Sequence, residues 1–197
     1  MLVSCAKDLY KMGFTSSVSG NHSIRIQDKW MWITPSGIPR YDLQEKDLVK
    51  VHLETSRIVG DGGGGSSRLK PSVEWHMHVS IYNKLLKVNA VVHTHGPYTL
   101  AIAISASELQ HIIEEAKIVV GNPVTIPNKP SGSIELANAV SNAFEEEEEV
   151  RAVIIRNHGV VSIGNNIHQA RAVIESLEEW AKIYTMSKIF DGPKYVL

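Results

Sequence analysis

The sequence contains one cysteine, Cys5, among 197 residues. A single thiol excludes an intrachain disulfide framework and a zinc site built from several thiolates. Any bound metal ion must therefore rely on nitrogen and oxygen ligands. A chain without disulfides suits the cytoplasm, where thiols stay reduced, and this is the location that we expect.

The net charge is close to zero, and long apolar runs are absent from the sequence. The 20 basic and 21 acidic residues give a formal net charge of -1, which supplies no general attraction for nucleic acid or an anionic membrane. No apolar run reaches the roughly 18 residues of a membrane-spanning helix, and the N-terminus lacks a signal-peptide pattern. We expect a soluble intracellular protein that binds neither nucleic acid nor membrane.

What is present is an ordinary globular composition, with 43% hydrophobic and 21% charged residues. At this length one domain over residues 1–197 is the default prediction, with residues 190–197 as a mobile tail. Apolar patterning predicts strands at 23–26, 30–33, 48–53, 90–95, 123–126, 153–155 and 160–163, and it also suits a strand at 117–120. Helical spacing predicts helices at 2–12, 72–86, 98–105, 133–144 and 167–189.

The stretch AVVHTH at 90–95 carries the first chemical signal. Side chains alternate along a strand, so His93 and His95 emerge on the same side while Thr94 turns away. Neutral imidazole is a common zinc ligand, and a catalytic zinc site typically has three protein ligands and one open position. An isolated pair of this kind also occurs at polar strand ends. His158, at the end of the predicted strand 153–155, is placed to complete a site, and Gly159 is expected to permit a sharp turn there.

Two turns offer places for an anion. Gly20-Asn21 and Ser36-Gly37 each combine an amide or hydroxyl side chain with a glycine that lets backbone N–H groups approach a ligand. Ordinary hairpin turns have the same composition, so that interpretation stays open. The glycine-rich run 61–67 lacks the Gly-Lys-Ser/Thr ending of a nucleotide-binding loop and receives no phosphate role.

The segment KPSVEW at 70–75 predicts the start of a helix. Ser72 is expected to cap it, which places Glu74 in the first turn, where the helix N-terminus favours a carboxylate or a docked anion. Glu74 is equally compatible with a purely structural helix-start acid. His76 and His78 point in different directions on a helix, so we expect both to be structural.

Taken in order, these motifs resemble the class II aldolase/epimerase (adducin-like) family. The resemblance rests on GN at 20–21, TPSG at 34–37, KPSVEW at 70–75, HTH at 93–95 and NHG at 157–159, and it covers residues 5–190. It implies an α/β fold of three α/β/α layers with a largely antiparallel central sheet. It also implies a C4 homotetramer with active sites between neighbouring subunits.

The resemblance further implies roles for single residues. His93, His95 and His158 would bind one zinc ion per subunit, and histidine also accepts cobalt and manganese. Glu74 would both approach the metal and handle the substrate proton. The family's phosphate-binding positions correspond to Gly20, Asn21, Ser36, Gly37 and Ser72.

The residue types also fit the chemistry of such an enzyme. Cleaving a ketose 1-phosphate between C3 and C4 leaves a carbanion beside a carbonyl, which needs a lysine Schiff base or a divalent metal as electron sink. Three histidines and no singled-out lysine favour the metal. The resemblance implies a small phosphorylated sugar such as L-fuculose 1-phosphate as the substrate, with dihydroxyacetone phosphate and an aldehyde such as L-lactaldehyde as the products. Neutral hydroxyl, amide and backbone donors would hold the phosphate.

Two departures from the family pattern concern the substrate. Val73 stands where the family often has a second serine, so one phosphate hydroxyl is missing. The tyrosine that protonates the aldehyde oxygen is also missing, and Glu114 lies near its position as a candidate second acid/base. Tyr195 resembles a tail tyrosine that closes over a neighbouring site. A solvent-exposed Glu114 and a frayed tail fit the sequence equally well.

Other activities of the same fold stay open. A pentulose-phosphate 4-epimerase would be expected to carry aspartate in place of Glu74, and a methylthioribulose-1-phosphate dehydratase would use the same metal site to expel water. A noncatalytic interaction module would be expected to lose metal ligands, whereas all three histidines are present here. The sequence does not identify the aldehyde partner.

Overall fold

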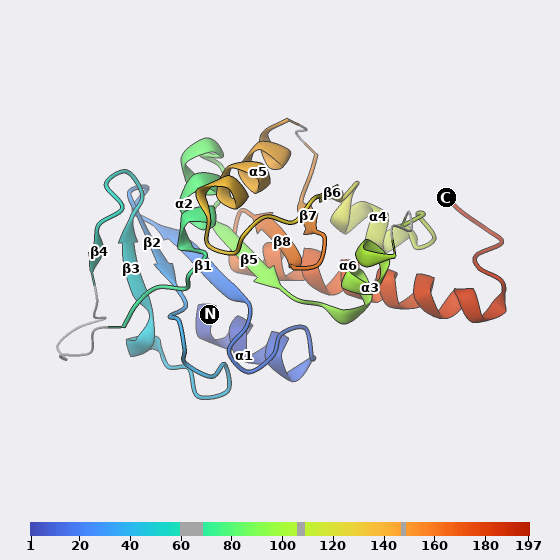
Figure 1. The fold of residues 1–197 in the computed structure, drawn as a ribbon, viewed down its shortest axis with the longest axis horizontal. Coiled ribbons are helices and arrows are strands. Elements are labelled where there is room, and N and C mark those ends of the chain that lie inside the picture. Colours follow the sequence, from blue (N-terminus) through green and yellow to red (C-terminus); the bar gives the residue numbers. More distant parts are fainter. Residues whose placement is uncertain (60–68, 106–108, 147–148) are drawn as a thin grey trace.

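The computed structural model describes residues 1–59, 69–105, 109–146 and 149–197 (Figure 1). The strands are β1 (Asn21–Ile26), β2 (Trp30–Ile33), β3 (Val49–His52), β4 (Ile58–Val59), β5 (Ala90–Thr94), β6 (Val124–Ile126), β7 (Ala152–Ile155) and β8 (Gly159–Gly164). The helices are α1 (Leu2–Lys11), α2 (Trp75–Lys84), α3 (Pro97–Ile104), α4 (Glu114–Val120), α5 (Ile134–Glu145) and α6 (Ile167–Ser187), with short 3-10 turns at Glu45–Asp47 and Lys188–Phe190. The predicted glycine-rich loop at 61–67 lies outside the described residues.

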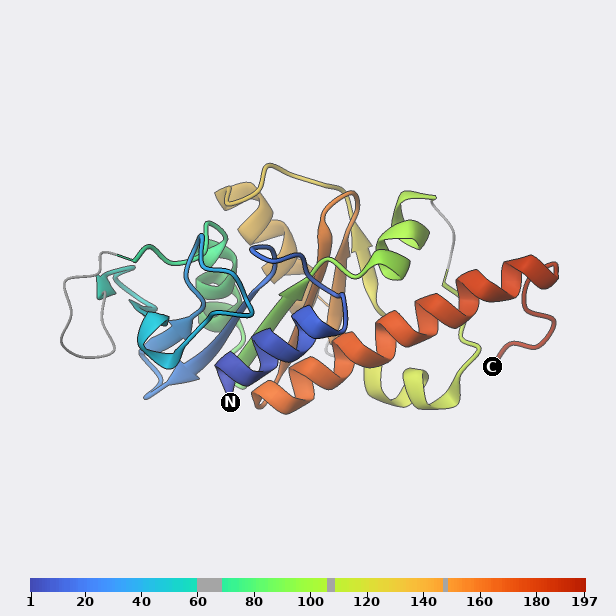
Figure 2. The ribbon, with the colours of Figure 1, turned by 90° about the horizontal axis from the view of Figure 1, so that it is seen from below.

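Within the described residues, all eight strands belong to one sheet, in the order β4-β3-β2-β1-β5-β8-β7-β6. Neighbouring strands are antiparallel except β6 and β7, which are parallel. Helices α2 and α5 pack on one face, whereas α1, α3, α4 and α6 pack on the other, with α1 beside α6 (Figure 2). The predicted three-layer α/β/α fold with a largely antiparallel sheet is therefore confirmed.

Alternation along β5 determines where its histidines point. Val91 packs into the core beneath α2 and α5, whereas Ala90 and Val92 pack into the core on the α6 side. His93 consequently continues the face of Val91. The end of β5 therefore presents His93 on the same side of the sheet as the N-terminus of α2.

Two predicted elements differ from the structure: the strand at 117–120 and the start of the helix at 72–86. The run at 117–120 is helical, because Ala116 and Val120, four residues apart, are both buried against the α6 layer and outweigh the strand preference of its β-branched residues. Helix α2 begins at Trp75 rather than at Ser72. The Ser72 N–H donates to the Thr34 carbonyl at 3.1 Å, which holds this residue in an extended segment beside the turn after β2.

No helix in the described ranges is both long and apolar enough to cross a membrane.

Candidate functional site

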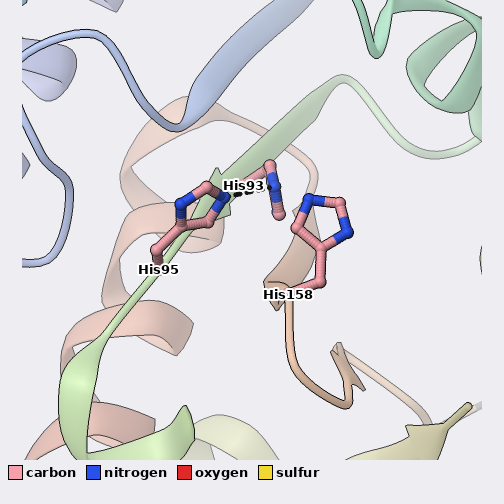
Figure 3. Close-up of side chains that lie close together, drawn as sticks. All are labelled: His93, His95 and His158. Atoms are coloured by element: carbon pink, nitrogen blue, oxygen red, sulfur yellow. Dashed lines mark hydrogen bonds between the residues drawn. The ribbon is translucent and has the colours of Figure 1, made fainter. Parts of the chain in front are cut away.

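Three histidines from two separate segments of the chain converge on one point. His93 lies near the end of β5, His95 follows the strand, and His158 lies in the turn between β7 and β8. One ring nitrogen of each lies within 4.8 Å of the others, and the rings turn toward one another (Figure 3). The Nε2 atoms of His93 and His95 are 3.0 Å apart. The predicted same-side placement of the first pair and its completion by His158 thus correspond to the observed geometry.

The hydrogen bonds of His93 establish which of its nitrogens is free. Its Nδ1 lies 2.9 Å from the Val160 carbonyl, which can only accept, so Nδ1 carries the hydrogen and Nε2 of the neutral ring presents a lone pair. That lone pair lies 3.0 Å from Oε2 of Glu74, an acceptor as well. Two acceptors at this distance require a cation, either a proton or a metal ion. The donor set therefore fits a divalent ion of the zinc type.

Glu74 connects the triad to the rest of the site. Only 3% of the residue is exposed, and it occupies the N-cap position of α2 without a capping hydrogen bond from its side chain. Its Oε1 accepts from Ser131 Oγ at 2.9 Å and lies 3.1 Å from His158 Nε2. Its Oε2 accepts from Asn21 Nδ2 at 2.9 Å. Burial opposes ionisation of this carboxyl group, but the imidazoles of His93 and His158 outweigh it and hold the pKa of Glu74 well below its ordinary value.

A buried hydrogen-bonded chain extends behind Glu74. Because Asn21 donates through Nδ2, its Oδ1 accepts from His78 Nε2 at 2.6 Å. His78 Nδ1 then accepts from Ser23 Oγ at 2.7 Å, and Tyr82 donates to Ser23 at 2.8 Å. Burial, followed by the field of His93, lowers the pKa of His78 to about 3, so its ring is neutral.

Sequence reasoning missed this chain, because it treated His78 as structural only. A signal existed, since Glu74, His78 and Tyr82 are spaced four residues apart and share one face of α2. Asn21 and Ser23 likewise alternate on one face of β1. Ser131, by contrast, comes from the loop before α5 and has no local signal.

Glycine and asparagine shape the turn that carries His158. Asn157, with φ of 59°, adopts the left-handed conformation, which asparagine tolerates. Gly159 has a different role from the predicted one, because it lies in β8 against the histidines. A Cβ there would collide with the Thr94 carbonyl oxygen and lie 2.6 Å from Cδ2 of His95. Glycine is needed here for close approach rather than for a sharp turn.

The chain just after His95 is held by a buried acid of α6. Glu178 accepts hydrogen bonds from the Tyr98 N–H at 2.7 Å and from the Thr99 N–H at 3.0 Å, both in the first turn of α3. The Thr99 hydroxyl donates to the same carboxylate. A Cβ on Gly96 would collide with this carboxylate, so the close approach requires glycine. The exit of β5, and with it His95, is thereby fixed.

The structure also brings together the segments predicted to bind phosphate. The Ser36 N–H donates to the Lys70 carbonyl, and the isolated pairing of Pro35 with Pro71 aligns the two stretches. Gly20, with φ of 70°, is buried beside the start of β1, where a Cβ would lie 2.5 Å from Cγ2 of Thr15. Residues 20–21, 34–37 and 70–74 therefore lie side by side, and Asn21 uses its side chain on Glu74 and His78.

The two candidate second acid/bases lie apart from the triad within one chain. Glu114 is exposed in the first turn of α4, and no contact in the described part of the chain joins it to the histidines. Tyr195 is 91% exposed. The Leu197 N–H donates to the His111 carbonyl, which places the tail beside the segment before α4. The roles of both residues stay predictions.

The chain matches the sequence model of a family described as the class II aldolase and adducin N-terminal domain over residues 1–185. It is 34% identical over 194 residues to 5-deoxy-D-ribulose 1-phosphate aldolase of Bacillus thuringiensis, covering 98% of this chain and 86% of that protein. It is 35% identical over 175 residues to L-fuculose phosphate aldolase of Methanococcus maripaludis, covering 89% of each. A solved structure of L-fuculose 1-phosphate aldolase superposes with a TM-score of 0.84 at 29% identity, covering 100% of this chain and 88% of that one.

Proposed function

Because the chain belongs to the class II aldolase and adducin N-terminal domain family, we propose that it is a zinc-dependent aldolase acting on a ketose 1-phosphate. The family predicted from the five motifs is confirmed, and with it the assignment to the class II aldolases. The observation that carries the proposal is the convergence of three imidazoles beside a buried carboxylate that approaches two of them within 3.1 Å.

The proposed substrate is L-fuculose 1-phosphate, with 5-deoxy-D-ribulose 1-phosphate as the second candidate. These are the sugars named for the relatives at 35% and 34% identity. Both are deoxy sugars with a phosphate at C1, so cleavage between C3 and C4 gives dihydroxyacetone phosphate from either. The second product is L-lactaldehyde from the six-carbon sugar and acetaldehyde from the five-carbon sugar.

The proposed mechanism assigns a task to each group. His93, His95 and His158 would hold the metal, which would supply a Lewis acid for the negative charge left beside the carbonyl. In the direction of condensation, the Glu74 carboxylate takes the proton from C3 of dihydroxyacetone phosphate. The new C3–C4 bond then forms, and the aldehyde oxygen takes a proton from a second acid, for which Glu114 and Tyr195 are the candidates. The residues that hold the phosphate are Gly20, Asn21, Ser36, Gly37 and Ser72.

The second acid is proposed to come from a neighbouring subunit. Glu114 and Tyr195 are exposed in one chain and do not contact its own histidines within the described residues. A cytoplasmic C4 homotetramer of single-domain chains, in which the tail 190–197 closes over the next site, would supply them. Sedimentation velocity of the purified protein tests the tetramer directly.

A coupled assay tests the reaction. The release of dihydroxyacetone phosphate is measured from a panel of ketose 1-phosphates, with and without a chelator, alongside a pentulose 5-phosphate and methylthioribulose 1-phosphate. We expect release from one or both deoxyketose 1-phosphates and its loss on chelation. Epimerisation or dehydration without release would favour the related activities, and release that persists after metal removal would overturn the metal mechanism.

A further inference from the structure

Arg40 is a buried cation without an acidic partner. The residue is 1% exposed, and no acidic side chain in the described ranges forms an ion pair with it. Charges buried in proteins are normally paired with an opposite charge, because removing them from water is costly. Burial lowers the pKa of Arg40 to about 10, which leaves the guanidinium charged at neutral pH. This chain therefore carries an unbalanced positive charge inside the fold.

Backbone carbonyls take up every donor of this side chain. A guanidinium offers five N–H groups, and here each has an acceptor. The acceptors are the carbonyl oxygens of Val18 at 3.2 Å, Ser19 at 3.3 Å, Gly20 at 2.5 Å, Pro35 at 3.4 Å and Ile38 at 3.1 Å. No donor is left for a ligand. Arg40 can therefore act on a substrate only through its charge and through the backbone that it holds.

The five acceptors lie within or next to the two turns predicted to bind phosphate, Gly20-Asn21 and Ser36-Gly37. Residues 18–20 lead into β1, and residues 35–38 follow β2. In a trans peptide the carbonyl and the next N–H point in opposite directions. By holding the carbonyls of Val18 and Ser19, the guanidinium turns the N–H groups of Ser19 and Gly20 away from itself. In the described part of the chain neither N–H has an acceptor.

The surroundings of Arg40 do not neutralise it. His22, whose side chain feels the charge of Arg40, is fully buried, and neither of its ring nitrogens has a partner in the described structure. Burial, followed by the field of Arg40, holds the pKa of His22 well below its ordinary value, so this ring is neutral. An anion at the mouth of the two turns would be the missing counter-charge.

We propose that Arg40 is the positioning residue and the fixed positive charge of the phosphate subsite: it holds the turns 18–20 and 35–38 together and favours a dianionic phosphate without touching it. This inference rests on the proposed function, in which the same turns hold the phosphate of the sugar. It adds a charge to a site that the sequence predicted to be built from neutral donors only.

Direct binding of inorganic phosphate, measured by calorimetry on the zinc-loaded protein, tests the inference. Arg40→Gln keeps two hydrogen-bond donors but removes the charge, and we expect its dissociation constant for phosphate to rise about tenfold or more. Arg40→Lys keeps the charge, and we expect its affinity within about threefold of the parent protein. Arg25→Gln is the matched control, because Arg25, at the other end of β1, also joins backbone carbonyls of two segments, residues 82–88 and Asp28, and its loss should leave phosphate binding unchanged.

The outcomes separate a charge from a purely structural role. A folded Arg40→Gln protein that binds phosphate like the parent overturns the inference. If that variant does not fold, Arg40→Lys decides, and a tenfold loss there overturns the charge assignment. With an active ketose 1-phosphate, Arg40→Gln should raise KM while changing kcat little. If no sugar phosphate is turned over but phosphate binding still depends on Arg40, the proposed aldolase reaction fails while the anion subsite stands.

Discussion

Asn21 Nδ2 donates to Oε2 of Glu74 at 2.9 Å, although 53 positions separate the two residues in the sequence. The same amide accepts from His78, whose ring is oriented by Ser23 and Tyr82. Every donor in this chain points toward the carboxylate. The acid of the site is therefore held from behind by β1 and α2, and its orientation is set by buried neutral groups.

Replacing Glu74 by glutamine removes the proposed base while keeping the shape of the side chain. We expect the rate of dihydroxyacetone phosphate release to fall about 10²- to 10⁴-fold, since a positioned general base contributes this much. Zinc content should stay near that of the parent, because the three histidines are intact. Glu145→Gln, which alters a surface acid paired with Lys84, is the control and should keep full activity. Full activity in Glu74→Gln would show that another group moves the proton.

The buried, neutral His78 should make the free energy of unfolding depend on pH in the acid range. Its folded-state pKa is lowered from 6.5 to about 3, mainly by burial. Below pH 6.5 the unfolded chain takes up a proton that the folded chain refuses, so the free energy of unfolding decreases as pH falls from 6.5 toward 3. Above pH 6.5 both states are neutral and this contribution is constant.

The variant His78→Gln isolates that contribution, because glutamine can donate to Asn21 but cannot titrate. Urea unfolding of the metal-free proteins provides the comparison, at two pH values inside the window between the two pKa values and at one above it, roughly pH 4.5, 5.5 and 7.5. The parent should lose stability faster than the variant by up to about 1.4 kcal/mol per pH unit. Parallel pH profiles would mean that His78 is protonated in the folded protein or partnered differently.

The proposed metal site should fail when one of its three proposed ligands is removed. His158 comes from the turn between β7 and β8, so His158→Gln leaves His93 and His95 in place but breaks the triad. We expect the bound zinc to fall from about one ion per chain to a small fraction after dialysis. A chelator should lower the Tm of the parent and leave that of the variant unchanged, because only the parent gains stability from the ion.

Exposed His168 on α6 provides the control for that experiment. His168→Gln should keep both its zinc and its response to chelator. Equal zinc content in His158→Gln and the parent would exclude His158 as a ligand.

Local patterns were enough to predict that His93 and His95 lie on one side of the sheet, and they predicted much of the sheet itself. The alternation of Val91, Val92 and His93 follows directly from strand geometry, which is why the direction of the histidines was predictable. The run at 117–120 was predicted wrongly because its β-branched residues suit a strand in isolation, and only contact with α6 decides for a helix. Short apolar runs carry this ambiguity wherever packing outweighs propensity.

The supporting groups of the site depend on contacts between segments far apart in the sequence. Ser131 reaches Glu74 across 57 positions, and Arg40 reaches back 20 positions to Gly20. Neither residue belongs to a recognisable sequence motif, because a serine in a loop and an arginine after a turn are normally expected on the surface. His78 was predictable in part. Its spacing from Glu74 can be read from the sequence, but its hydrogen bond to Asn21 on β1 cannot.

Gly159 provides the sharpest test of how closely the two ligand segments are packed. A Cβ at this position would lie 2.8 Å from Cε1 of His93 and still closer to His95 and to the Thr94 carbonyl. These are backbone and ring atoms rather than the ends of flexible side chains, so Gly159→Ala must push the β7–β8 turn away from β5. We expect zinc binding to weaken by at least about tenfold, because a catalytic site tolerates little displacement of its ligands.

Gly13→Ala separates this effect from ordinary glycine strain. Gly13 has φ of 78° and no heavy atom within 4 Å of an added Cβ, so alanine there should cost about 1–2 kcal/mol of stability through the backbone alone. It should nevertheless bind zinc like the parent. Zinc titration and thermal unfolding of both variants distinguish the two cases. If Gly159→Ala loses stability but binds zinc as Gly13→Ala does, the ligands tolerate the displaced turn, and His158 is held less tightly than its packing against β5 implies.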